Sequence, residues 1–238
     1  MDIIVFDARG HMGEIVCRRV REKQCGALIM TSNKPEGDML PLYAVSRGDC
    51  IIDFSHHAAT ADVCGTAARL GLPLVEATTG QTEEEKRLIE QTAKLVPVFF
   101  SGNMSVGIAL LMRLARETAK CFPDADIEIV EAHHNRKIDV PSGTALMLAE
   151  SVREARPNAE MVVGRHENGK RAANEVGIHS LRMGNIVGMH EVIVNAGSQS
   201  ITLKHEAYDR ALFADGALAA AEFIVGKSAG LYGMADMV

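Results

Sequence analysis

The stretch from Glu131 to Ala145 reads Glu-Ala-His-His-Asn-Arg-Lys-Ile-Asp-Val-Pro-Ser-Gly-Thr-Ala and joins two elements of different periodicity. Before it, Asp126–Val130 alternates polar and apolar side chains, which predicts a β-strand. From Ala145 to Ala155 apolar residues recur at spacings of three and four, which predicts a helix. The stretch is therefore predicted to be a loop that leaves a strand and ends at a helix N-terminus.

This loop concentrates basic side chains beside the predicted helix start. His133, His134 and Lys137 fall within five residues, and Gly143 follows them at the N-terminus of the predicted helix. Backbone N–H groups at a helix N-terminus, with the positive end of the helix dipole, bind anions, and glycine permits a close approach. A histidine can move protons near neutral pH. The loop therefore suits a small acid that carries carboxylates.

Two other interpretations of the histidine pair have to be weighed. Adjacent histidines alone are more often surface residues or part of a metal site than a catalytic pair. Lys137, three residues after His134, and the Pro-Ser-Gly-Thr turn favour catalysis. The pair has no carboxylate or third histidine at ligand spacing, so we expect no metal.

Composition limits the kinds of partner that this chain takes. Its 238 residues are 47% hydrophobic and 24% charged, as in ordinary globular proteins, and the net charge of −6 argues against a nucleic-acid-binding surface. No apolar run approaches the ~20 residues of a membrane span, and no signal segment precedes the first strand. Five scattered cysteines without C-x-x-C spacing favour reduced thiols and a cytoplasmic location.

The first hundred residues alternate between strand and helix periods. Repeated βα units of this kind predict a parallel, doubly wound sheet, which binds ligands beyond the carboxyl ends of its strands. Thr82 and Glu85 form a capping-box pattern at one helix start. The predicted strands are Asp2–Phe6, Ala27–Thr31, Ile51–Phe54, Pro73–Ala77 and Val96–Phe100.

Three loops fall at the carboxyl ends of these strands, where a nucleotide would bind. The first resembles a G-x-x-G-x-x-G dinucleotide turn that lacks its first glycine. Close packing of helix on strand, or simple turn chemistry, would explain the same residues. The candidate cofactor-binding residues are Asp7, Ala8, Arg9, Gly10, His11 and Met12, then Ala77, Thr78 and Thr79, and then Ser101, Gly102, Asn103 and Met104.

A change of pattern after residue 103 predicts a second domain. An amphipathic helix from Ile108 to Ala119 is followed by the strand–loop–helix stretch and then by short strands, with a turn near Gly197. A last helix, Ala211–Val225, has Asp209 as a candidate cap and Gly226 as its stop. The predicted later strands are Met161–His166, Val176–Arg182, Met189–Val194 and Ser200–His205.

The fold class is therefore α/β: a doubly wound, Rossmann-type nucleotide domain plus an α+β domain with an open mixed sheet. Residues 1–103 and 209–238 form the predicted dinucleotide-binding domain. Residues 104–208 form the predicted substrate-binding and oligomerisation domain. The joins are expected near residues 101–107 and 208–210.

The stretch Glu131–Ala145 closely resembles the signature of the 4-hydroxy-tetrahydrodipicolinate reductase (dihydrodipicolinate reductase) family of lysine and diaminopimelate biosynthesis. The resemblance implies reduction of a cyclic imine derived from 4-hydroxy-tetrahydrodipicolinate by NADPH or NADH, with loss of water. It also implies a homotetramer assembled through the sheet of the middle domain, and nucleotide binding by the three loops. Asp7 and Ala77 stand where the family has glycine.

The resemblance assigns roles to the residues of the loop. His133 is the expected proton donor. Lys137 is expected to neutralise a substrate carboxylate and is a second candidate for the proton role. The expected substrate-binding residues are His134, Ser142, Gly143 and Thr144. His190 receives no chemical role, because a hydrogen-bonded structural histidine is the simpler interpretation.

The choice of cofactor and two rival functions stay open on the sequence alone. Ser32, Asn33 and Lys34 follow the second strand where NAD-binding folds usually carry an acid, which favours NADPH over NADH, with Arg9 as a second cation. The rivals are another small-acid dehydrogenase of the same fold and a degenerate nucleotide-binding regulatory relative. The first would not be expected to carry the histidine loop, and only Asp7 supports the second.

Overall fold

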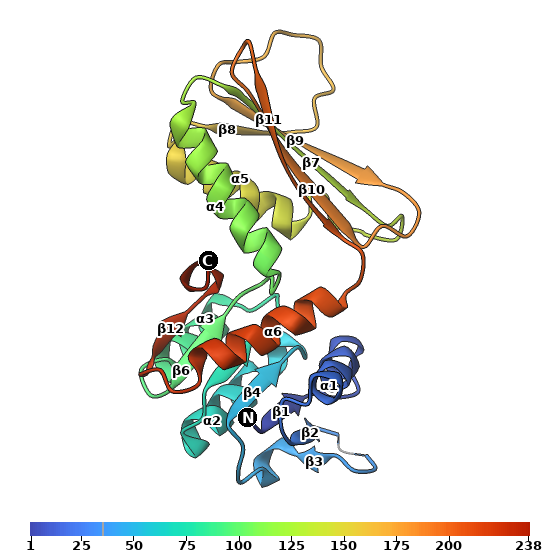
Figure 1. Cartoon of the computed structure of the whole chain (residues 1–238), viewed down its shortest axis with the longest axis vertical. Helices are drawn as coiled ribbons and strands as arrows, with labels where there is room; N and C mark the ends of the chain where they lie inside the picture. Colours follow the sequence, from blue (N-terminus) through green and yellow to red (C-terminus); the bar gives the residue numbers. More distant parts are fainter. Residues whose placement is uncertain (35) are drawn as a thin grey trace. The chain divides into compact units, whose positions relative to one another are not determined.

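The computed structural model describes residues 1–34 and 36–238, and the chain folds into two compact units (Figure 1). Unit 1 comprises Met1–Ser105 and Arg210–Met237, and unit 2 comprises Val106–Asp209 with Val238. Each unit has its own sheet and its own buried apolar core. Within the described residues, no helix is both long and apolar enough to cross a membrane.

Unit 1 is built on a parallel sheet whose strand order is β12-β6-β5-β4-β1-β2-β3. The order reverses between β1 and β4, which confirms the predicted doubly wound topology. All five predicted strands are present with ends shifted by no more than one residue, and β3 and β12 are additional. The strands are β1 (Ile3–Phe6), β2 (Leu28–Ser32), β3 (Leu40–Pro41), β4 (Cys50–Asp53), β5 (Leu74–Glu76), β6 (Pro97–Phe100) and β12 (Gly230–Tyr232).

Helices cover both faces of this sheet. Helices α1 (His11–Lys23) and α6 (Ala211–Ile224) pack together, as do α2 (Thr60–Leu70) and α3 (Glu83–Thr92). The predicted capping box is confirmed, since Thr82 accepts the N–H of Glu85 and the Glu85 carboxylate accepts the N–H of Thr82. Three short 3-10 helices complete the unit: η1 (Leu42–Ala44), η2 (His57–Ala59) and η3 (Met234–Asp236).

Helix α6 begins at Ala211, as predicted, but its last residue and its N-cap residue differ from the prediction. It ends at Ile224 instead of Val225, and Gly226 follows with a φ of 85°. The residue in the N-cap position is Arg210, not Asp209, and its side chain makes no capping bond. A Cβ at Gly216 would lie 1.7 Å from the carbonyl oxygen of Met104, so glycine is needed for α6 to pack against that loop.

Unit 2 is an open mixed sheet with two helices on one face. The strand order is β11-β10-β7-β9-β8, in which β7, β8 and β9 run parallel and β10 runs antiparallel to β7 and β11. Apolar side chains of α4 and α5 share one core with alternate residues of the strands. The elements are α4 (Val106–Cys121), β7 (Asp126–His133), α5 (Gly143–Ala155), β8 (Glu160–Val163), β9 (Glu175–Arg182), β10 (Gly188–Asn195) and β11 (Ser200–Ala207).

Two turns define the edges of this sheet. The turn predicted at Gly197 is confirmed: Asn195 accepts the N–H of Gly197, whose φ is 79°. The prediction that one strand continues to His166 is wrong, because β8 stops at Val163. Gly164 then takes a φ of 63°, which leads the chain out of the extended conformation.

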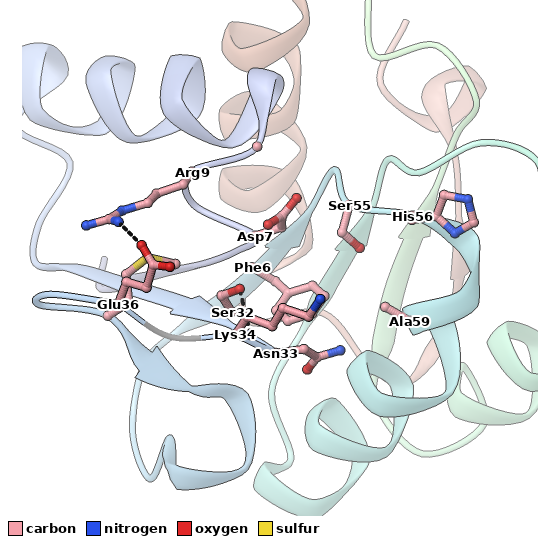
Figure 2. A pocket seen from close by; sticks show the side chains of 12 residues that line it. Phe6, Asp7, Arg9, Ser32, Asn33, Lys34, Glu36, Ser55, His56 and Ala59 are labelled. Atoms are coloured by element: carbon pink, nitrogen blue, oxygen red, sulfur yellow. Dashed lines mark hydrogen bonds and ion pairs between the residues drawn. The ribbon is translucent and has the colours of Figure 1, made fainter.

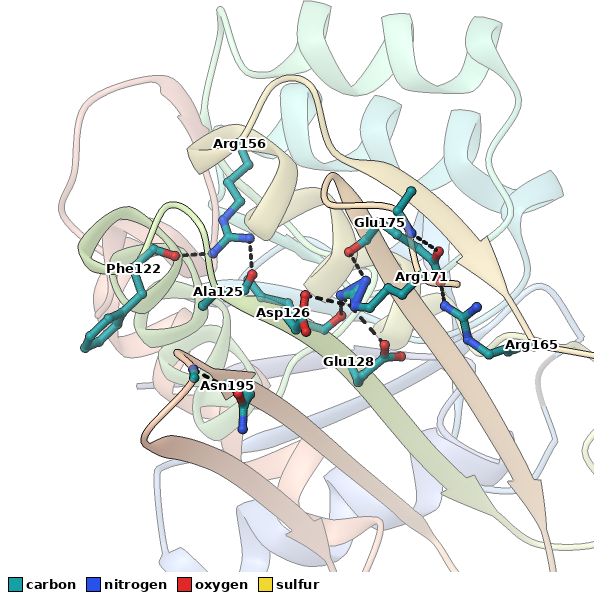
Figure 3. Close-up of polar contacts among 12 residues, drawn as sticks. Phe122, Ala125, Asp126, Glu128, Arg156, Arg165, Arg171, Glu175 and Asn195 are labelled. Atoms are coloured by element: carbon teal, nitrogen blue, oxygen red, sulfur yellow. Dashed lines mark hydrogen bonds and ion pairs between the residues drawn. The ribbon is translucent and has the colours of Figure 1, made fainter. Parts of the chain in front are cut away.

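An ionic network fixes the end of unit 2 at which β7 begins (Figure 3). Arg156 donates to the carbonyl oxygens of Phe122 and Ala125, which lie between α4 and β7. Arg171 donates to the Ile127 carbonyl at 3.0 Å and pairs with Asp126 at 3.1 Å. These contacts fix the N-terminal end of β7, and Glu131 and His133 lie at the C-terminal end of the same strand.

Candidate active site

The centre of the candidate site is a buried carboxylate–imidazole pair at the end of β7. Glu131 and His133 are two residues apart on the strand, so both side chains point to the face that also carries Ile127 and Ile129. Oε2 of Glu131 lies 2.6 Å from Nδ1 of His133. Glu131 is fully buried and His133 is 9% exposed.

Arg182 and a backbone N–H complete the surroundings of Glu131. Arg182 is the register partner of His133 on β9, and its two terminal nitrogens donate to both Glu131 oxygens at 2.8 Å. The N–H of Ser142 donates to Oε1 at 3.1 Å. Burial raises the pKa of Glu131, but the hydrogen bonds, from Arg182 above all, outweigh it and lower the pKa to about 2. Glu131 is therefore ionised throughout the physiological pH range.

An ionised Glu131 determines the tautomer of His133. Because the carboxylate only accepts hydrogen bonds, Nδ1 of His133 must carry the proton that lies between them. Burial lowers the pKa of His133, against the raising effect of Glu131, so the neutral ring is favoured near pH 7. The lone pair of the neutral ring is then on Nε2. A Cβ at Gly188 would lie 3.2 Å from Nε2, so glycine at that position leaves room beside this nitrogen.

Ser142 positions the helix N-terminus and is itself committed to internal contacts. It is the N-cap of α5 and accepts the N–H of Ala145 at 3.2 Å. Its Oγ lies 3.1 Å from Nε2 of buried His190, whose pKa burial lowers to about 3. The structural interpretation of His190 fits this geometry. Gly143 is exposed at the first turn beside Thr144, where N–H groups face an incoming anion.

Lys137 lies close by with its ammonium held by a carboxylate. Its Nζ is 2.8 Å from Asp139, whose carboxylate is 58% exposed. Lys137 is the main cause of the lowered pKa of Asp139, which shows that this ammonium stabilises a carboxylate. Arg136 points elsewhere and donates to Asn185 at 3.0 Å. The loop from His134 to Lys137 is closed by the Lys137 N–H, which donates to the His134 carbonyl at 3.1 Å.

Unit 1 contains a separate cavity of about 470 Å³ at the carboxyl ends of β1, β2 and β4 (Figure 2). This volume lies in the usual range for small-molecule sites. Of the sequence-predicted residues, the cavity brings together Asp7, Arg9, Gly10, Ser32, Asn33 and Lys34. Six further lining residues were not predicted from the sequence, and the polar ones are Ser55, His56 and Glu36. Ser55 and His56 follow β4, and the pairing of β4 with β1 was the signal that would have found them.

The first loop shows how an aspartate replaces the missing glycine. Asp7 has a φ of 52°, which is the left-handed conformation usual for glycine. A Cβ at Gly10 would lie 2.4 Å from Oδ2 of Asp7, and one at Gly13 would lie 2.1 Å from its carbonyl oxygen. Both glycines therefore permit the tight turn. Arg9 pairs with Glu36 at 2.8 Å, so one cation of this cavity already has a carboxylate beside it.

The remaining predicted cofactor residues do not line the cavity. Ala8, Ala77, Thr78 and Met104 are buried, and Thr79 and Gly102 are exposed. His11 is exposed, with Nη1 of Arg210 2.6 Å from its Nε2, and Met12 is half-buried. Ser101 donates to the Asn103 carbonyl at 2.8 Å, and Asn103 accepts the Ser105 N–H at 2.9 Å. These two bonds fix the loop that follows β6.

Comparison with known proteins identifies the family. The family profile "Dihydrodipicolinate reductase, N-terminus" matches residues 1–104, and "Dihydrodipicolinate reductase, C-terminus" matches residues 107–238. A 4-hydroxy-tetrahydrodipicolinate reductase from Caldanaerobacter subterraneus subsp. tengcongensis is 41% identical over 99% of this chain and 97% of its own length. One from Rickettsia bellii is 41% identical over 99% and 94%.

A solved structure shows the same fold over the whole chain. The dipicolinate-bound dihydrodipicolinate reductase from Paenisporosarcina sp. TG-14 matches with a TM-score of 0.82 at 22% identity, covering 100% of this chain and 99% of that one. Among the described residues, no cluster of three or more metal-ligating side chains occurs. The chain therefore belongs to the dihydrodipicolinate reductase family.

Proposed function

We propose that this chain reduces 4-hydroxy-tetrahydrodipicolinate to tetrahydrodipicolinate with NAD(P)H, with loss of water, in lysine and diaminopimelate biosynthesis. The observation that carries the proposal is the buried Glu131–His133 pair beside Lys137 and the N-terminus of α5, in a chain whose relatives carry this reductase name. A proton carrier and anion-binding groups together match a cyclic imine that bears carboxylates.

His133 supplies the proton in this proposal. Glu131 holds the ring through Nδ1, which directs Nε2 toward the substrate. Because the pKa of His133 is lowered by burial, the protonated ring is a strong acid and returns to the neutral form readily. A bound dicarboxylate would raise this pKa, since nearby negative charge favours the imidazolium. Substrate binding would thus favour protonation of the His133 ring, which is the proton donor.

Lys137, His134 and the first turn of α5 bind the carboxylates of the substrate. Lys137 exchanges its contact with exposed Asp139 for a substrate carboxylate. The N–H groups of Gly143 and Thr144 bind the second carboxylate at the helix N-terminus. Ser142 positions these groups instead of contacting the substrate, because its N–H and hydroxyl are engaged inside the protein.

The cavity of unit 1 fits the nucleotide that this chemistry requires. Ser55 lines it with a buried Oγ that has no partner among the described residues, and Asp7 and Gly10 form a tight turn at the strand end. When bound, the nicotinamide supplies the hydride. Asp7, Arg9 and Gly10 would hold the phosphates, and Ser32, Asn33 and Lys34 would face the adenosine ribose.

We infer a modest preference for NADPH over NADH. Lys34 and Arg9 are cations at the cavity wall, and a 2′-phosphate attracts both. Glu36 opposes the preference because its carboxylate pairs with Arg9 and can accept a ribose 2′-OH. Titration of both cofactors against wild type and Lys34→Ala checks this: the variant should lose affinity for NADPH and keep its affinity for NADH.

The uncovered face of the unit 2 sheet supports the proposed homotetramer. Helices α4 and α5 share a core with one face, while the other carries partly exposed apolar side chains such as Met189 and Ile193 on β10 and Leu181 on β9. Burial of such a face between copies is favourable. Sedimentation of wild type and Ile193→Lys tests it: the wild type should be a tetramer that the variant disrupts.

The decisive assay follows NADPH and NADH oxidation with enzymatically generated 4-hydroxy-tetrahydrodipicolinate. The rival reactions are followed in the other direction, as reduction of NADP+ and NAD+ with aspartate or homoserine. We expect turnover only with the imine precursor. Turnover with a rival substrate alone would assign the chain to another small-acid dehydrogenase. Nucleotide binding without any turnover would assign it to the regulatory class.

A further inference from the structure

Two carboxyl groups face each other inside unit 1 at the carboxyl ends of neighbouring strands. Asp53 ends β4 and Glu76 ends β5, and they are register partners in the parallel pair. Both are fully buried. Ile51 and Leu74, two residues earlier on each strand, pack against α2 and α3, so the two acids lie on that same face of the sheet.

Each acid also holds the loop that follows its own strand. Oδ1 of Asp53 accepts the N–H of Ser55 at 2.8 Å. Oε1 of Glu76 accepts the N–H of Thr78 at 3.2 Å and the side-chain amide of Gln81 at 3.3 Å. The loop after β4 goes on to line the cavity of unit 1. The loop after β5 carries three of the candidate cofactor residues, Ala77, Thr78 and Thr79.

The other two oxygens of the pair need a proton. Oδ2 of Asp53 and Oε2 of Glu76 are buried, and by geometry neither makes a hydrogen bond among the described residues, although the hydroxyls of Ser55 and Thr78 lie beside the pair. Two buried carboxylates on register partners of neighbouring strands repel each other strongly, so both are not ionised at the same time. If the pair shares one proton, a protonated Glu76 can donate a hydrogen bond from Oε2 to Oδ2 of an ionised Asp53. Both of these oxygens then have a hydrogen-bond partner.

The groups around the pair leave it without a compensating cation. From α2 it faces the Cys64 thiol, whose pKa burial raises to about 11, and beside it lie the hydroxyls of Ser55 and Thr78. On the α3 side, Nδ1 of His57 lies 3.0 Å from the Glu85 carboxylate. On the opposite face of the sheet, Asp215 of α6 pairs with α1 residues.

We propose that Asp53 and Glu76 share one proton and act as a positioning pair that holds the β4 and β5 loops in the arrangement that binds the nucleotide. This inference rests on the proposed function, because it requires the nucleotide to bind at the carboxyl ends of β4 and β5. Ionisation of the second carboxyl would force the two strand ends apart by like-charge repulsion, and cofactor affinity would fall with it.

The pH dependence follows from the direction of the shift. Burial raises the pKa of Glu76, and the charge of Asp53 adds to it, to about 9. The holding effect is therefore fully present at pH 7 and is lost as the pH rises through about 9. For one group with this pKa, the Kd for cofactor rises about tenfold between pH 7.5 and pH 10.

The test is direct NADH binding to the full chain from pH 7.5 to pH 10, without substrate, for wild type, Glu76→Gln and Glu84→Gln. NADH is used because it lacks the 2′-phosphate that is proposed to contact Lys34. Glutamine keeps the shape of Glu76 and donates to Asp53 without a titratable proton, so this variant should bind NADH with a pH-independent Kd. Exposed Glu84 is the matched control, and its variant should keep the roughly tenfold change.

Infrared spectra at pH 7.5 give a second readout that needs no ligand. The wild type and the Glu84→Gln variant should show the carbonyl band of a buried protonated carboxyl, and Asp53→Asn and Glu76→Gln should each lose it. A pH-independent wild-type Kd, an unchanged pH dependence in Glu76→Gln, or the absence of the band would overturn the proposal. Normal NADH binding without reductase turnover would contradict the proposed function alone, whereas no NADH binding at any pH would overturn both.

Discussion

The buried carboxyl groups of the two units meet the same physical problem in opposite ways. Glu131 in unit 2 lies against Arg182 and His133 and keeps its charge, with a pKa of about 2. Glu76 in unit 1 lies against another acid, Asp53, and keeps its proton, with a pKa of about 9. Burial raises the pKa of both groups. The charge of the partner therefore decides which form the fold stabilises.

This difference gives the two units opposite responses to pH. The folded-state pKa of Glu131 lies below its usual value of 4.5, so its contribution is present above that pH and is lost as the pH falls through about 2. For Glu76 the contribution is present below pH 4.5 and is lost as the pH rises through about 9. The permanent negative charge of Glu131 suits the proposed site, because it favours reprotonation of His133 after each turnover. A neutral pair suits an edge that receives phosphates.

Arg182→Met should produce the largest loss of stability. It leaves the Glu131 charge buried without its main partner, and removal of one partner of a buried ion pair costs ~3–5 kcal/mol. Urea unfolding measures this loss. The control is Arg116→Met, because Arg116 of α4 pairs at 2.9 Å with exposed Glu154 of α5, away from the uncovered face of the sheet, and should change stability by less than ~1 kcal/mol. Similar losses in both variants would mean that Glu131 does not depend on Arg182.

Lys137→Ala should raise the KM and weaken inhibition by pyridine-2,6-dicarboxylate by ~10–100-fold each. A hydrogen bond to a charged group contributes ~1.5–3 kcal/mol, which corresponds to this range. Steady-state kinetics with and without the inhibitor provide the measurement. Arg136→Ala removes the same charge one residue away, from a side chain directed at Asn185, and should leave both constants nearly unchanged. An unchanged inhibition constant in Lys137→Ala would place Lys137 outside the site.

Glu76→Gln should stabilise the chain by ~1–3 kcal/mol at pH 9, since it removes the cost of keeping a carboxyl group protonated. The gain should shrink toward pH 4, below the usual pKa of 4.5, where the unfolded state is also largely protonated. Urea unfolding at both pH values measures the difference. A gain of the same size at both would show that Glu76 does not titrate in the folded chain.

Asp7→Asn should tighten cofactor binding by ~1 kcal/mol, or roughly fivefold, because a carboxylate near the pyrophosphate repels it. Asparagine also accepts the left-handed conformation that Asp7 adopts, so this variant isolates the charge. Asp7→Gly should show a similar gain. Equal Kd values for wild type and both variants would show that the Asp7 carboxylate does not face the phosphates.

Local patterns predicted most of the fold. Strand alternation and helical spacing located the long elements, and Thr82 with Glu85 located one helix start. The missed strands, β3 and β12, have two and three residues, too few for a periodic signal. They exist because neighbouring strands accept their backbone hydrogen bonds, and such pairing depends on the tertiary structure.

The site was predictable only in part, for a similar reason. His133 and Lys137 are close in sequence, so one motif contained both. Arg182, in contrast, reaches Glu131 across 51 residues of chain, and Asp53 meets Glu76 through strand register. Residue spacing does not encode such pairings. Ser142 belonged to the motif, but its internal hydrogen bonds became visible only with Glu131 and His190 in place.

The most direct test of the central claim is the turnover of His133→Gln with the imine substrate, compared with His166→Gln, which alters an exposed histidine. If His133 donates the proton, the first variant should lose ~10²–10⁴-fold in kcat with its NADPH affinity unchanged, and the second should match wild type. Wild-type kcat/KM should also fall as the pH rises above the lowered pKa of free His133. Near-normal turnover by His133→Gln would contradict the account.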